Sequence, residues 1–149
     1  MSHRRLLARA LLLALLGASS TGNASEARPA IVVGEVSAGA VGADGATLDL
    51  FRWLVEREIG RLDLDQPRRP TTYVFSAALV RLDTRASRDG ASAICIVSGA
   101  LRRANSGAIV ALLHGSGAVD GDRGALPGTK AKALEVAVHG AVRRLPEAL

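Results

Sequence analysis

The sequence predicts an α+β fold, a single domain in which a mostly antiparallel sheet of about four strands carries two helices on one face. Three apolar runs rich in β-branched residues fall between residues 72 and 120, separated by the turn sequences Arg88-Asp89-Gly90 and Asn105-Ser106-Gly107. These runs predict a three-stranded antiparallel meander, in which the two sets of turn residues supply the positive-φ positions that tight reversals need. One further apolar run precedes the meander, and a segment with helical periodicity lies on each side of it. The expected order is therefore β-α-β-β-β-α.

The composition fits one apolar core with few rings. A chain of 149 residues lies in the one-domain range, and we expect the domain to span residues 30–149. Hydrophobic residues make up 48% of the chain but aromatic ones only 3%, so Val, Leu, Ile and Ala must fill the core.

The first 24 residues have the three parts of a secretory signal. Arg4 and Arg5 form the charged start, residues 6–16 an apolar run, and residues 17–25 a small, polar exit. Cleavage is expected after Ala24, with Ala18 and Ala27 as alternatives. The apolar run is too short for a stable membrane anchor, so we expect an unanchored periplasmic or secreted protein.

The basic character of the chain is concentrated in this leader. Loss of Arg4, Arg5 and Arg9 lowers the formal net charge by three, from +5 to +2. Such a charge is an ordinary solvated surface, and no nucleic-acid partner is expected. Four other arginines stand in pairs near the ends of predicted elements: Arg102, Arg103, Arg143 and Arg144. The first pair is expected to protect a strand edge, and the second to complement a helix dipole.

The first expected strand, Ala30–Val36, is followed by a Gly/Ala loop over residues 37–45. Gly39, Gly42 and Gly45 have the spacing of neither the dinucleotide-binding fingerprint nor a P-loop. The loop is therefore predicted to be a flexible connector and not a phosphate site.

The first helix is expected from Thr47 to Leu62, with Asp44 or Thr47 as its N-cap. Glu58 and Arg61 are spaced to meet on its solvent side. The prolines at 67 and 70 prevent any continuation. Its apolar stripe consists of Leu48, Phe51, Val55, Ile59 and Leu62, flanked by Leu54.

The closing helix is expected to begin at Thr129 as its cap and to reach about Leu145. Ala137 and Ala141 would let its axis come close to the sheet. Its apolar stripe consists of Ala131, Leu134, Ala137, Val138, Ala141, Val142 and Leu145.

Few residues offer catalytic chemistry. Cys95 has no cysteine partner and stands between Ile94 and Ile96, which predicts a buried, inert thiol. His114 and Ser116 lie two apart on a predicted strand and could form a nucleophile with its base. Side chains so placed point in parallel, however, and the sequence lacks a nucleophile elbow. A bulge or a bend where another element packs closely better explains the glycines at 115 and 117.

No metal or cofactor site is expected. Asp120-Gly121-Asp122 lacks the further oxygens and the closing Glu of a calcium loop, and predicts a turn. His139 projects from the closing helix on the side opposite its stripe, away from other metal-ligating residues in the sequence.

Trp53 is the one large side chain outside the stripe of the first helix. One interpretation is that the indole covers the Gly/Ala loop or an end of the sheet. The other is that Trp53 and Leu50 form a partner-binding anchor, with Arg57 one turn further on lying over the ring as a cation.

Four stretches resemble, in the spacing of their apolar residues, a group of small exported bacterial proteins of unknown function. These stretches are Leu79 to Leu82, Ala93 to Val97, Gly107 to Leu113 and Ala133 to Val142. The order of elements is also similar to the α/β domain shared by the TolB N-terminal region, the curli secretion channel lipoprotein and LpoB-type activators of peptidoglycan synthases. The chain differs from that domain in lacking a strand-helix unit before the meander and a lipid-anchoring cysteine. The resemblance implies no catalytic residue.

These observations predict a non-enzymatic binding or scaffolding module of the bacterial cell envelope, with an envelope protein as partner. The alternative is a small secreted hydrolase using His114 and Ser116, for which Ser116→Ala would abolish activity and preserve the fold.

Overall fold

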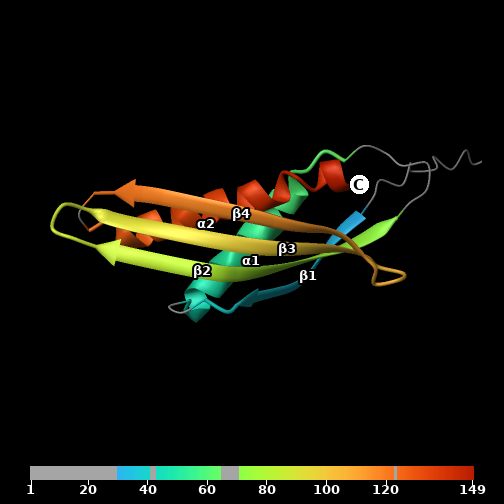
Figure 1. Ribbon diagram of the computed structural model, residues 1–149, viewed down its shortest axis with the longest axis horizontal. Helices are drawn as coiled ribbons and strands as arrows, with labels where there is room; N and C mark the ends of the chain where they lie inside the picture. Colours follow the sequence, from blue (N-terminus) through green and yellow to red (C-terminus); the bar gives the residue numbers. More distant parts are fainter. Residues whose placement is uncertain (1–29, 41–42, 65–70, 123) are drawn as a thin grey trace, which may run out of the picture.

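The elements of the chain form the predicted α+β arrangement (Figure 1). The computed structural model describes residues 30–40, 43–64, 71–122 and 124–149. The predicted leader, Gly42 and the prolines at 67 and 70 lie outside these ranges. The elements are β1 Ala30–Ala38, α1 Gly45–Gly60, β2 Thr72–Ala86, β3 Ala91–Arg103, β4 Ile109–Gly121, α2 Leu126–Val142 and a 3₁₀ helix Pro146–Ala148.

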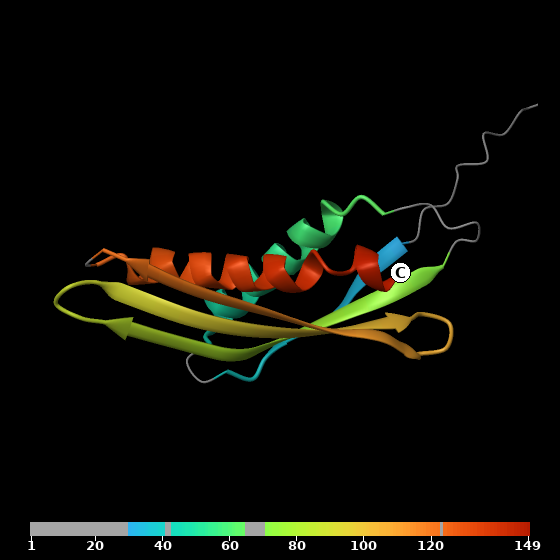
Figure 2. The same ribbon diagram turned by 45° about the horizontal axis from the view of Figure 1, so that its top comes forward.

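The four strands form one sheet in the order β1-β2-β3-β4. The last three strands pair antiparallel and are the predicted meander, whereas β1 pairs parallel with β2. Parallel neighbours need a crossover connection, and α1 provides it. Both helices lie on the same face of the sheet, and the opposite face carries no helix in the described part of the chain (Figure 2).

The two hairpin turns differ in backbone conformation. Gly107 adopts a φ of 68° and its N–H donates to Arg103 O at 2.8 Å, as predicted for a tight reversal. In the other turn Gly90 has no positive φ. The end of β4 approaches closely there, and a Cβ on Gly90 would lie 2.7 Å from Gly121 O. Glycine is therefore needed at position 90 because a side chain would clash with the end of β4, and not because the backbone requires a positive φ.

Alternate residues of the strands enter the core between sheet and helices. Phe75, Leu79, Val97 and Leu101 are fully buried on this face. Cys95 is buried among them, as predicted, and burial raises the pKa of its thiol to about 12. The thiol is therefore protonated at neutral pH and packs as a small apolar group.

The backbone of α2 lies directly on β4. A Cβ on Gly115 would overlap Ala137 O, and one on Gly117 would overlap Ala133 O. The glycines thus mark close packing of another element, as the sequence indicated, but the pairing with β3 runs through both without a shift, so neither forms a bulge. Val138, from the predicted stripe, is fully buried beside this contact, whereas Val136 leaves 41% of its surface exposed.

The predicted ends of α2 are wrong. The helix begins at Leu126 and has Pro127 in its first turn, a position that proline favours because no helical N–H bond is needed there. Thr129 is consequently inside the helix, where its hydroxyl donates to Ala125 O at 2.9 Å, and it does not cap. The helix ends at Val142, although Leu145 is still fully buried.

Helix α1 has the first of its two predicted caps. The Asp44 carboxylate accepts from Thr47 N at 2.8 Å and also from the Thr47 hydroxyl. The hydrogen bond from the Thr47 hydroxyl, and after it the one from Thr47 N, lowers the pKa of Asp44. Phe51 and Val55 of the predicted stripe are fully buried, and so is nearly all of Leu54.

Two smaller predictions about strand ends are also wrong. Arg102 and Arg103 end β3, which is an inner strand of the sheet, so they protect no edge. Asp120 and Gly121 extend β4 and pair with β3, and do not belong to a turn.

Candidate binding surface on the two helices

Trp53 stands on the outer side of α1 under a fixed cation. The indole leaves 53% of its surface exposed, and the guanidinium carbon of Arg57 lies 4.7 Å from the ring centroid. This is the geometry that the one-turn spacing predicted, and such a contact contributes about 0.5–1 kcal/mol at an exposed site. The structure thus brings together two of the three residues of the predicted anchor.

Leu50, the third residue of the predicted anchor, is only partly exposed. It packs against the hydrophobic core between the helices and the sheet. Less of its apolar surface is therefore available to a partner than of Trp53.

Two carboxylates hold Arg57 over the ring. Its Nη2 lies 2.8 Å from Glu135 Oε1 on α2 and 2.9 Å from Glu58 Oε1 on its own helix. A guanidinium tied at two points keeps its orientation, so little side-chain entropy remains to be lost when a partner binds.

Glu58 is buried, which the sequence prediction of a solvent-side pair with Arg61 did not anticipate. Only 7% of its surface is exposed. Its Oε2 lies 2.9 Å from His139 Nδ1, and its Oε1 accepts from Arg57 and Arg61. Burial raises the pKa of Glu58, but the hydrogen bonds from His139 and Arg57 outweigh burial and hold the pKa below its ordinary value.

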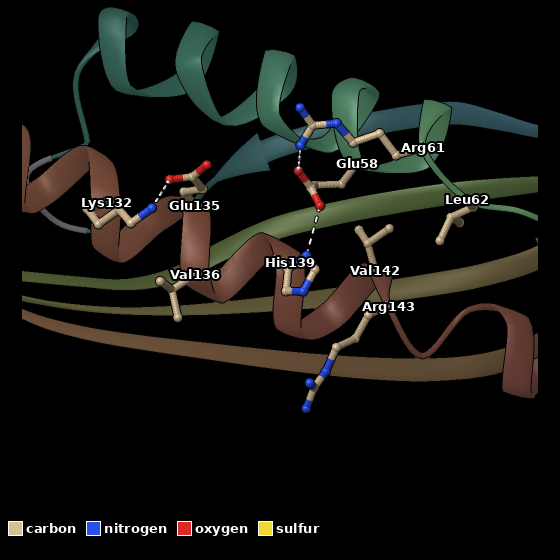
Figure 3. A pocket seen from close by; sticks show the side chains of 9 residues that line it. All are labelled: Glu58, Arg61, Leu62, Lys132, Glu135, Val136, His139, Val142 and Arg143. Atoms are coloured by element: carbon tan, nitrogen blue, oxygen red, sulfur yellow. Dashed lines mark hydrogen bonds and ion pairs between the residues drawn. The ribbon is translucent and has the colours of Figure 1, made fainter.

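A cavity of about 400 Å³ lies along this network, between α1 and α2 (Figure 3). Glu58 and His139, joined by their hydrogen bond, lie on its wall, and Val136 and Arg143 point away from α1. It is lined by Glu58, Arg61, Leu62, Lys132, Glu135, Val136, His139, Val142 and Arg143.

The cavity rim carries a second ion pair. Lys132 Nζ lies 2.7 Å from Glu135 Oε2, while the other oxygen of Glu135 accepts from Arg57. The hydrogen bond from Lys132, and after it the one from Arg57, lowers the pKa of Glu135. The exposed aromatic ring of Trp53 and the charged cavity are therefore joined through Arg57 into one surface, which we call the helix surface.

The sequence signal for Glu58 was present but incomplete. Glu58 is three residues from Val55 and four from Leu62, which places it inside the apolar stripe. Its partner His139 is 81 residues away in the chain, so the pairing that satisfies the carboxylate could not be found from local spacing.

His114 and Ser116 lie on the opposite face of the sheet. His114 pairs with Ser98 and Ser116 with Ile96, and both side chains are exposed. They are two residues apart on β4 and point in parallel, and no hydrogen bond joins them among the described residues. The structure therefore does not bring them together as a nucleophile and base.

The described residues contain neither a metal-binding cluster nor a membrane-spanning helix. Within residues 30–40, 43–64, 71–122 and 124–149, no group of three His, Cys, Asp or Glu side chains is placed to hold a metal ion. No helix in these ranges is long and apolar enough to cross a membrane.

Comparisons with known proteins give a fold and no family. No family model matches the chain, and no curated protein matches it in sequence. A hypothetical protein from Chlamydia trachomatis has a similar structure, with a TM-score of 0.52 and 8% identity over 80% of this chain and 94% of the other. This similarity shows the fold alone.

Two further structures are more distant. A protein of the family DUF330 from Xanthomonas campestris has a TM-score of 0.46 and 13% identity over 80% of this chain and 88% of its own. A PelC dodecamer from Paraburkholderia phytofirmans has a TM-score of 0.43 and 14% identity over 84% of this chain and 90% of its own. None of the three names indicates a TolB, curli or LpoB protein, so that remote likeness stays a prediction.

Proposed function

We propose that this protein is a non-enzymatic binding or scaffolding module of the bacterial cell envelope, and that a partner protein binds the helix surface with Trp53 at its centre. The observation that carries the proposal is the half-exposed indole held beneath an immobilised guanidinium. Tryptophan and arginine are the residues most enriched at the energetic centres of protein interfaces. The leader-like sequence over residues 1–24 supports export to the compartment in which this partner would be met.

The arrangement of charges supports binding over a role in folding. Arg57 is fixed by Glu58 and Glu135 in the chain without a partner, so the ring and cation form a preorganised pair. An indole with about half of its surface in water contributes little to the core. A partner that covers it would gain the apolar burial that folding left incomplete.

Trp53→Ala tests this proposal. The variant should keep the wild-type melting temperature within a few degrees and should lose capture of a defined band from the envelope fraction of the native cell. Val80→Ala is the matched control, because Val80 is 54% exposed on the sheet face without helices. If Trp53→Ala retains capture, or if it lowers stability by about 3 kcal/mol as core tryptophan truncations do, Trp53 is part of the fold and the proposal fails.

A further inference from the structure

Strand β4 is an edge of the sheet and lacks the usual protection of an edge. It spans 13 residues, contains no Lys, Arg or Pro, and its one carboxylate, Asp120, is next to its end. The other edge strand, β1, has nine residues, a register shift between Val33 and Val36, and an exposed Glu35. Proteins normally guard edges by such shortness, bulges or charges. Strand β4 has a register shift of its own at Val110, near its start, but residues 112–118 pair with β3 without a shift. Among the described strands this part of β4 is thus the edge open to pairing.

The hydrogen-bond pattern identifies which groups of β4 face outward. Ala104 N donates to Thr72 O at 2.9 Å, so even-numbered residues of β3 hydrogen-bond to β2 and odd-numbered ones to β4. Cys95 of β3 pairs with Gly117 of β4, so odd-numbered residues of β4 face β3. The residues whose N–H and C=O point away from the sheet are Leu112, His114, Ser116 and Ala118.

A row of alternating donors and acceptors at this spacing fits an extended polypeptide backbone. A second copy of this chain fits poorly through the same strand. Because α2 lies directly on β4, antiparallel pairing of two β4 strands about a two-fold axis perpendicular to the sheet would leave the two α2 helices little more than one strand spacing apart, about 5 Å. Packed helices need about 8–10 Å between their axes. A single extended segment meets no such obstacle.

The surroundings of the edge define the side chains that such a segment would carry. On the face without helices, Leu112 leaves 66% of its surface exposed. On the helix side, Val136 and Arg143 point away from α1 (Figure 3). A segment with apolar residues at alternate positions would cover Leu112 on one face and approach Val136 on the other. An acidic residue at its end would meet Arg143.

We propose that an extended segment of a partner protein, alternating in apolar residues, adds to the sheet as a fifth strand by pairing with the backbone of residues 112–118. This site is on the opposite side of α2 from Trp53 and does not depend on the helix surface. Backbone hydrogen bonds supply the affinity. The side chains that lie beside Leu112 and Val136 supply the preference for apolar residues at alternate positions of the segment.

A synthetic peptide measures the pairing directly. The probe is a twelve-residue peptide of alternating valine and threonine with a glutamate at each end, titrated into the purified mature protein. Binding should saturate, and amide hydrogen exchange at Leu112, His114, Ser116 and Ala118 should slow about ten-fold or more at saturation. Absence of saturable binding up to about 1 mM overturns the proposal.

Ser116→Pro removes one outward N–H and leaves the bonds from β4 to β3 in place, since proline is tolerated on an edge strand whose N–H faces solvent. It should weaken peptide binding at least about ten-fold. Ser116→Ala, which keeps the N–H, should bind like the wild type. Equal binding by Ser116→Pro overturns the proposal.

Two further measurements keep the test decisive. If Ser116→Pro fails to fold, N-methylation of the probe at every second residue replaces it, and undiminished binding of that probe contradicts backbone pairing. If the edge amides of the free protein are already protected in a concentration-dependent way, a second copy occupies the edge and the proposed occupant is wrong.

Discussion

The two helices are attached to the molecule in different ways. Helix α2 lies on β3 and β4 through glycine and alanine backbones and fully buried side chains such as Leu134 and Val138. Helix α1 also buries apolar side chains, among them Phe51 and Val55, but its contact with α2 includes a buried carboxylate with three cationic or imidazole partners. The apolar contact fixes the position of α2 on the sheet. The polar contact sets the positions of exposed groups, and Trp53 is among those that it positions.

The largest effect is expected from charging the apolar contact. Val138→Asp would place a carboxylate at a fully buried position, where desolvation costs several kcal/mol, about the whole stability of a domain. Circular dichroism of the variant should show an unfolded protein at room temperature. Val136→Asp, two residues earlier and 41% exposed, is the control and should fold. Equal effects of the two would mean that the assigned face of α2 is wrong.

A smaller change in the same contact tests how closely the backbone of α2 approaches β4. Gly115→Ala adds one methyl group that would overlap Ala137 O, so α2 must move away, at a cost of about 3 kcal/mol or more. Thermal denaturation should show a lower melting temperature. Gly128→Ala in α2 is the control, because its added methyl group meets nothing within 4 Å, and it should leave stability unchanged or raise it by up to about 1 kcal/mol. A stable Gly115→Ala protein would contradict the close approach of α2.

The polar contact should respond to pH where the apolar contact does not. The pKa of Glu58 is lower in the folded protein than its ordinary value, about 4.3 when unfolded. Its contribution to stability is therefore fully present above that ordinary value and is lost as the pH falls through the lower, folded pKa.

Glu58→Gln isolates this contribution. At pH 7 we expect a loss of about 1–2 kcal/mol, because Arg61 and His139 are largely exposed and can be rehydrated. The difference in unfolding free energy between wild type and variant, measured by urea denaturation, should shrink as the pH falls below about 4.3. A difference that stays constant down to pH 2 would show that the charge of Glu58 has no role.

The apolar contact was largely predictable and the polar one was not. The spacing of Leu134, Val138 and Ala141 predicted the buried face of α2, because helical periodicity is a local property. The prediction failed at Thr129, where Pro127 starts the helix earlier. The burial of Glu58 depends on His139, which only the folded chain brings near.

In the candidate site too, the local contact was predictable from the sequence and the contact between distant segments was not. The contact between Arg57 and Trp53 spans one helical turn and was predicted from the sequence. The carboxylate of Glu135, which fixes Arg57 from the other helix, depends on how α1 and α2 cross and could not be predicted. Which N–H and C=O groups of β4 point away from the sheet likewise depends on the register between β3 and β4.

The central claim is that the polar contact between α1 and α2 fixes Arg57 over Trp53, so that the exposed indole can meet a partner. The most direct test replaces Trp53 with a photo-crosslinking phenylalanine derivative in the native cell and exposes the cells to ultraviolet light. A crosslinked product that forms from position 53, and does not form when the same derivative replaces Val80, is the result we predict. No product from position 53, or equal products from both positions, would contradict the claim.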